Sequence, residues 1–178
     1  VATGATRPET GDRFDGEVVN AFDVLEGAEV GEAEVGEDVL LFDENRWVVT
    51  AQTGLEILGR GASLEMVSSD HYPAFRTEQP NLPGFVAALQ AGGAEFTGNH
   101  TVAAVTDDGT VTLRNTLTGD TATREPDSVV VVGRRAADES LYLDLDERRD
   151  DVYRVGDAVS PRKLDRAVYD GERLARRL

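Results

Sequence analysis

The order of hydrophobic and polar positions is clearest between residues 38 and 68. Four consecutive apolar residues at 39–42 predict a strand buried on both faces, as in a parallel sheet covered on each side. Apolar positions then recur at helical spacing over 47–60, and Gly59 and Gly61 are stop signals. The segment 63–68, S-L-E-M-V-S, predicts a second strand. Strand, helix and strand together predict a βαβ unit.

The pattern beyond residue 68 predicts a second helix, a meander and a closing segment. The helix is expected at 85–91, ended by two glycines. Two turn signals, D-D-G at 107–109 and T-G-D at 118–120, join three strand candidates and predict antiparallel hairpins. A further buried strand is expected at 128–133, a short one at 152–155, and a final helix from Ser160 and Pro161 as cap and first residue. The three meander strands are expected at 101–106, 111–115 and 121–125.

These elements predict an α/β fold. It is a three-layer Rossmann-like unit with an antiparallel meander inserted before its last strand. This layout is similar to the nucleotide domains of flavin disulfide reductase-like proteins, a likeness of fold that does not establish activity. The Gly- and Glu-rich stretch 26–37 is expected to be a linker.

The composition of the chain excludes several classes of function. The 178 residues carry 34 Asp and Glu against 18 Lys and Arg, a net charge of −16, and Lys163 is the only lysine. Such a surface repels nucleic acid and anionic membrane, and it favours a protein adapted to a salt-rich cytosol. The sequence shows neither a membrane-spanning run nor a signal segment, so a cytoplasmic location is expected. Cysteine is absent, which excludes thiolate-bound metals and clusters within this chain.

A dinucleotide site of the Rossmann kind needs G-x-G-x-x-G after the first strand, because glycines let backbone amides approach the pyrophosphate. Residues 43–47 read D-E-N-R-W instead. Two carboxylates therefore stand where an anion would bind. The acidic residue expected about 20 positions later is matched most nearly by Ser68 or Asp70. The sequence argues against NAD(P) binding at this loop.

The sharpest motif lies near the end of the sequence. It runs Y-R-V-G-D-A over 153–158 and S-P-R-K-L over 160–164, followed by Ala167, Gly171 and Ala175-Arg176. This motif resembles the closing motif of the multidomain NADH:flavin oxidoreductases of the Old Yellow Enzyme type. That family includes trimethylamine dehydrogenase, histamine dehydrogenase and 2,4-dienoyl-CoA reductase. The segment Ala2-Thr3-Gly4 resembles the short strand of the same nucleotide domain.

The resemblance implies a partial site for FAD or ADP. Gly156 would end a strand, Asp157 would accept hydrogen bonds from sugar or ribityl hydroxyls, and the next helix would offer amides to phosphate. Arg162 would pair with phosphate, although an exposed helix charge is an equal alternative. Thr3 and Gly4 would belong to the same site. No catalytic residue and no metal ligand is expected.

The resemblance also implies domains and partners. Residues 1–36 would end a segment of the FAD/ADP domain with a linker, 37–145 would form an NAD(P)-domain-like unit, and 146–178 would close the FAD/ADP domain. In the relatives, an FMN-binding barrel and a cysteine-bound 4Fe-4S cluster precede this region. The expected partners are therefore N-terminal domains of the same polypeptide, and a homodimer of the parent oxidoreductase is left open. The fragment alone is expected to be inactive.

Two other functions stay open at this point. In the first, the chain is a ligand-free structural module of such an enzyme. In the second, it is an NAD(P)H-dependent reductase domain, and the lost glycines argue against this function. Among the remaining polar residues, His71, His100 and Trp47 are expected in packing or hydrogen bonding. The acidic pair Asp107-Asp108 is explained by turn chemistry, because a hard cation needs about six converging oxygens.

Overall fold

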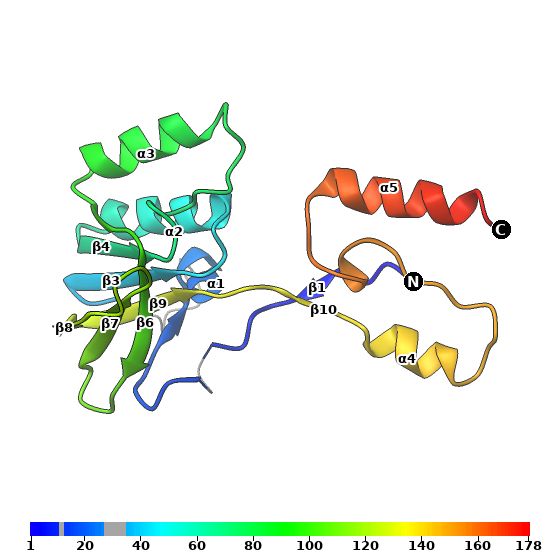
Figure 1. The fold of residues 1–178 in the computed structure, drawn as a ribbon, viewed down its shortest axis with the longest axis horizontal. Helices are drawn as coiled ribbons and strands as arrows, with labels where there is room; N and C mark the ends of the chain where they lie inside the picture. Colours follow the sequence, from blue (N-terminus) through cyan, green and yellow to red (C-terminus); the bar gives the residue numbers. More distant parts are fainter. Residues whose placement is uncertain (11–12, 27–34) are drawn as a thin grey trace. The chain divides into compact units, whose positions relative to one another are not determined.

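The computed structural model describes residues 1–10, 13–26 and 35–178 of the chain. They form two compact units (Figure 1). Unit 1 combines Val1–Pro8 with Arg135–Leu178, and unit 2 consists of Glu9–Arg134. Both termini of the chain therefore contribute to one unit, and unit 2 is inserted between them in sequence.

Unit 2 is built on a five-stranded parallel sheet. The strand order is β2-β9-β3-β4-β5, and each neighbouring pair is parallel. The bounds are Val19–Asn20 (β2), Asp38–Asp43 (β3), Ser63–Ser68 (β4), Glu95–Thr97 (β5) and Ser128–Val132 (β9). The chain proceeds from β3 through β4 to β5 and then returns to β9 on the other side of β3. The strand order therefore reverses between β3 and β9, the place where open α/β sheets commonly bind ligands.

Helices cover one face of this sheet. They are α1 (Ala21–Glu26), α2 (Val48–Gly59) and α3 (Leu82–Ala91), and α2 and α3 lie above the strands in Figure 1. Val39 and Leu41 of β3 pack in one buried cluster with Ile57 of α2. Leu40 and Phe42 lie in a second cluster on the opposite face. The apolar run of β3 is thus buried on both faces, as its sequence predicted.

An antiparallel meander forms the third layer. Its strands pair in the order β6-β7-β8, and Val105, Val111 and Leu113 pack against Leu40 and Phe42 of the parallel sheet. The bounds are His100–Val105 (β6), Val111–Asn115 (β7) and Thr121–Arg124 (β8). Helices, parallel sheet and meander confirm the predicted three-layer Rossmann-like α/β fold.

Unit 1 joins the first residues of the chain to its last 44. Strand β1 (Ala5–Thr6) pairs antiparallel with β10 (Ala136–Ala137). The Val1 amine donates to the Tyr153 carbonyl at 2.6 Å, and the Val155 amide donates to the Val1 carbonyl at 3.1 Å. The other elements are α4 (Ser140–Asp146), the single 3-10 turn η2 (Gly156–Ala158) and α5 (Leu164–Ala175).

The structure divides the chain at residues 8/9 and 134/135, whereas the sequence suggested 36/37 and 145/146. Residues 9–36 fall in unit 2 because β2 pairs with β9 and α1 packs its buried Ala21 and Val24 in the core of unit 2. Residues 135–145 fall in unit 1 because β10 pairs with β1. Pairing between distant segments, which composition does not report, sets these boundaries.

Three predictions for unit 1 were wrong in detail. Residues 152–155 form no strand, because their contact with Val1 is not extended into a ladder. The final helix begins at Leu164 rather than at Ser160, since the Val159 and Ser160 amides turn back to the Gly156 carbonyl. The short strand predicted at 2–4 lies at Ala5–Thr6.

Unit 2 begins with two short elements. The sequence did not predict β2 and α1, which have two and six residues and are too short for a repeating pattern to identify them. Most of the predicted linker 26–37 lies outside the described residues. Among the residues that the structure describes, no helix is long and apolar enough to cross a membrane.

Candidate functional site

The closing motif forms a tight turn against α5. Gly156 opens η2 with a φ of +67°, a backbone conformation that favours glycine. A Cβ at this position would lie 3.2 Å from the Cβ of Ala167 in α5. The left-handed backbone and the close approach together explain why a glycine precedes Asp157.

Asp157 is fixed by two neighbours from unit 1. Its Oδ1 accepts the backbone N–H of Arg162 at 3.0 Å, and its Oδ2 lies 3.5 Å from Nη1 of Arg135. The side chain is nevertheless 21% exposed. Because each carboxylate oxygen has two acceptor positions, Asp157 keeps capacity for a hydroxyl donor from a ligand.

Arg162 uses its polar groups within unit 1. Its Nη2 pairs with Asp170 of α5, and its Nε donates to the Ser160 carbonyl at 3.1 Å. Its backbone N–H is the donor to Asp157. Direct pairing of this guanidinium with a phosphate would therefore compete with Asp170.

Thr3 and Gly4 lie beside the segment that follows β10. The Thr3 hydroxyl donates to the Asp138 carbonyl at 2.7 Å, and the Gly4 carbonyl accepts the Asp138 amide at 3.2 Å. Gly4 has a φ of +90°, and a Cβ there would meet nothing within 4 Å. The backbone of Gly4 is thus open to approach. Val1, three residues earlier, connects the same segment to 153–155.

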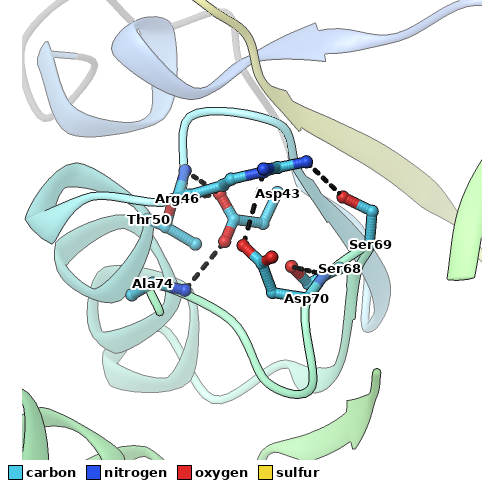
Figure 2. A network of polar contacts seen from close by, with 7 residues as sticks. All are labelled: Asp43, Arg46, Thr50, Ser68, Ser69, Asp70 and Ala74. Atoms are coloured by element: carbon cyan, nitrogen blue, oxygen red, sulfur yellow. Dashed lines mark hydrogen bonds and ion pairs between the residues drawn. The ribbon is translucent and has the colours of Figure 1, made fainter. Parts of the chain in front are cut away.

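A second polar cluster lies in unit 2, where β3 ends (Figure 2). Asp43 is fully buried. Its Oδ1 accepts the Arg46 amide and the Thr50 hydroxyl, both at 2.6 Å, and its Oδ2 accepts the Ala74 amide at 2.7 Å. Burial raises the pKa of Asp43, although hydrogen bonds from Thr50, Ala74 and Arg46 favour the charged form.

Arg46 extends this cluster to the end of β4. Its Nη2 donates to the Ser69 hydroxyl at 2.6 Å, and its Nε lies 3.4 Å from Oδ2 of Asp70. The Arg46 carbonyl accepts the Arg76 amide at 2.8 Å. Its φ is +68°, which costs a non-glycine residue about 1–2 kcal/mol. The surrounding contacts hold this residue in that conformation.

The remaining polar residues singled out in the sequence have local partners. Nδ1 of His100 lies 2.7 Å from the Gly98 carbonyl, and the His71 ring contacts Phe75 edge to face. Asp108 accepts the Thr106 hydroxyl and the Thr110 amide within its hairpin. Trp47 is half-buried before α2. Among the described residues, no group of three or more His, Asp or Glu is arranged to hold a metal ion.

Sequence reasoning singled out Asp43 and Asp157 but missed several of their partners. Arg135 follows a buried strand and gave no signal of its contact with Asp157. Ala74 contributes only its backbone amide, which no side-chain pattern reveals. The spacing of Asp43 and Arg46 is a local turn signal that could have been read, since an Asp side chain often accepts an amide two or three residues later.

Comparison with known proteins bears first on the fold and then on the resemblance seen in the sequence. The solved structure of histamine dehydrogenase from Rhizobium sp. 4-9 matches 99% of this chain and 30% of that chain, with a TM-score of 0.82 at 23% identity. The chain therefore shares the fold of the matching region of that structure. No known protein-family profile matches the chain.

Two curated relatives are dehydrogenases. The N,N-dimethylglycine/sarcosine dehydrogenase of Chromohalobacter salexigens is 27% identical over 95% of this chain and 29% of that protein. The dimethylamine dehydrogenase of Hyphomicrobium is 37% identical over 62 residues, 30% of this chain and 8% of that protein. These relatives confirm the resemblance to the trimethylamine and histamine dehydrogenase family. The chain spans less than a third of the length of each.

Proposed function

We propose that this chain is the nucleotide-binding region of an amine-oxidising flavoprotein, and that unit 1 contributes to a site for FAD or ADP. The dehydrogenase relatives support the oxidoreductase class. The observation that carries the proposal is Asp157, a carboxylate held in place on two sides and still partly exposed, directly after a glycine that the left-handed backbone and the close approach to α5 require.

The residues of unit 1 fit part of such a ligand. Asp157 would accept a ribose or ribityl hydroxyl, and Gly156 would place it. Gly4 would allow a close approach of the backbone, with Thr3 fixing its segment to residue 138. Arg162 would contribute mainly by positioning Asp157 through its amide, because its guanidinium pairs with Asp170. A bound flavin would supply electron transfer.

The rest of the site would come from other parts of a longer polypeptide. Supporting this proposal, α5 leaves Leu164 79% exposed and Val168 64% exposed, and no residue of this helix is fully buried. An apolar helix face of this kind marks an interaction surface. We assign it to N-terminal domains of the parent, which would carry FMN and a 4Fe-4S cluster, with a parent homodimer as a further arrangement.

A ligand-free structural module is the second candidate. The internal pairs of Asp157 with Arg135 and of Arg162 with Asp170 favour it, because both side chains are useful without a nucleotide. The two candidates differ in one measurable respect. Mass spectrometry of nucleotide released from the purified full-length parent would detect FAD or ADP in addition to FMN only under the first.

Substitution of Asp157 tests the site directly in the full-length parent. Asp157→Ala removes a charge-assisted acceptor worth about 1.5–3 kcal/mol, so we expect affinity for FAD or ADP to fall about tenfold to a hundredfold. Asp157→Asn keeps an acceptor for the Arg162 amide and separates loss of ligand contact from loss of the turn. Asp43→Ala, in the other unit, should leave this affinity unchanged. Weaker binding of FAD or ADP in Asp43→Ala, together with unchanged binding in Asp157→Ala, would assign the nucleotide to unit 2.

A further inference from the structure

The crevice where the unit 2 sheet reverses its strand order is bridged by the protein itself. The loop after β3 reaches across to β9: the amides of Glu44 and Asn45 both donate to the Val132 carbonyl, at 3.1 and 2.9 Å. Nδ2 of Asn45 donates to the Gly133 carbonyl at 3.2 Å. The carboxyl ends of β3 and β9 are thus joined at the place where a ligand of an open α/β sheet would enter.

Asp43 supplies an anion at this place. In a dinucleotide site, the pyrophosphate accepts amides at the start of the helix after the first strand. Here the acceptor is the buried Asp43 carboxylate. It takes the Arg46 amide just before α2 and the Thr50 hydroxyl in the first turn of α2. Two donors beside the start of α2, the Arg46 amide and the Thr50 hydroxyl, are therefore already engaged by a carboxylate of the protein itself.

Arg46 occupies the neighbouring position at the end of β4. That strand end is where a ribose hydroxyl is bound in a dinucleotide site. The Arg46 guanidinium contacts Ser69 and Asp70 there, and both Nε of Arg46 and Oδ2 of Asp70 are buried (Figure 2).

The same two residues fasten the segment 69–77. Asp43 accepts the Ala74 amide, and the Arg46 carbonyl accepts the Arg76 amide. Pro73, Ala74 and Thr77 are buried, so the segment is anchored in unit 2 at these positions, whereas residues 71, 75 and 76 are exposed. Figure 2 shows residues 69, 70 and 74 of this segment around the Asp43 and Arg46 side chains.

We propose that Asp43 and Arg46 are built-in occupants of the dinucleotide crevice of unit 2, which hold the segment 69–77 closed over it. Unit 2 then keeps its shape without a dinucleotide and serves as a rigid part of the protein. This inference concerns unit 2 alone and does not depend on the nucleotide site proposed for unit 1.

Amide hydrogen exchange of the 178-residue chain in molar KCl tests the inference, because it reports opening of each segment separately. In Asp43→Ala and in Arg46→Ala, exchange over 69–77 should accelerate about tenfold or more, since each loses contacts that hold the segment. Asp108→Ala removes a carboxylate that accepts two hydrogen bonds in a hairpin of the same unit. That control should leave exchange over 69–77 unchanged.

The second part of the experiment measures exchange with NADPH added. We expect millimolar NADPH to leave exchange over 43–50 and 69–77 unchanged in the wild-type chain. Protection of these segments by NADPH would overturn the inference, and so would unchanged exchange in both variants. If Asp43→Ala does not fold, Ser69→Ala decides: it removes the Arg46 hydrogen bond alone and should accelerate exchange over 69–77 about twofold to tenfold. Unchanged exchange in that variant would overturn the inference equally.

Discussion

Asp43 and Asp157 each accept the backbone N–H of a residue that follows shortly in sequence, Arg46 and Arg162 respectively. Their surroundings differ. Asp43 is fully buried and accepts three hydrogen bonds from three segments, whereas Asp157 has two partners and 21% of its side chain exposed. A carboxylate that is enclosed and satisfied acts as part of the structure. One that is fixed but accessible can still bind a ligand.

The first prediction concerns Asp43 and pH. Burial raises the folded-state pKa of Asp43 above its unfolded value of about 3.9, so the folded chain binds more protons between these two values. The contribution of Asp43 to stability is therefore present at low pH and is lost as pH rises through its folded pKa. Relative to Asp43→Asn, the wild-type chain should gain stability as pH is lowered from about 8 to about 4.5. Urea unfolding in molar KCl measures this difference.

Asp108 provides a control of opposite sign. The hydrogen bond from Thr106 lowers the pKa of Asp108, so its contribution is present above the unfolded pKa and is lost as pH falls through the folded one. Relative to Asp108→Asn, the wild-type chain should lose stability on acidification. A wild-type advantage over Asp43→Asn that shrinks at low pH would contradict the assignment for Asp43.

At the scale of elements, the backbone packs closely where β5 turns into β6. A Cβ added to Gly98 would lie 2.1 Å from the carbonyl oxygen of His71, an atom of the backbone that cannot move independently. The Asn99 amide also donates to the Asp70 carbonyl at 2.8 Å. The turn between β5 and β6 thus supports the segment that closes the unit 2 crevice.

The second prediction compares two glycines of unit 2. Gly98→Ala should lower the free energy of unfolding by about 1–3 kcal/mol, because the added methyl group displaces the backbone near residue 71. Gly84→Ala lies in α3, with nothing within 4 Å of the added Cβ, and should raise stability by about 0.5–1 kcal/mol. Thermal unfolding of both variants in the same buffer checks the pair. Equal effects would show that this packing is looser than described.

At the scale of the whole chain, charge is divided between the units. Unit 2 contains 23 acidic and 7 basic residues, whereas unit 1 contains 11 of each. The entire net charge of −16 therefore lies on the residues of unit 2. Self-repulsion of this size destabilises a compact state unless salt screens it.

The third prediction is that KCl stabilises unit 2 more than unit 1. The Debye length falls from about 30 Å at 0.01 M to about 3 Å at 1 M, so repulsion among the carboxylates of unit 2 is screened. Hydrogen exchange across this range should slow in β3, β4 and β9 and change little in α5. Equal salt effects on both units would argue against salt adaptation as the reason for the composition.

The fourth prediction is that the isolated 178-residue chain does not oxidise NADH or NADPH. It has no cysteine to carry redox chemistry, and its own side chains occupy the dinucleotide crevice of unit 2. Anaerobic and aerobic assays of the pure chain, without added flavin, measure the rate. Steady turnover above the uncatalysed background would favour the reductase alternative.

The sequence determined the features that depend on local order. The apolar runs of β3 and β9 are continuous because these strands are buried on both faces, and the turn signals placed the meander within a residue or two. The Gly156-Asp157 motif and its following helix pointed to the family that the relatives confirm. Each of these signals lies within a few neighbouring residues.

The tertiary structure decided what distant segments do together. Residues 1–8 and 135–178 form one unit only because β1 pairs with β10 and Val1 contacts 153–155. From the sequence alone, the Asp43 carboxylate suggested repulsion of a bound anion. In the folded chain, the same carboxylate accepts hydrogen bonds from Arg46, Thr50 and Ala74. The reason is physical: backbone amides satisfy a buried carboxylate, and which amides lie within reach depends on how the chain folds back on itself rather than on residue type.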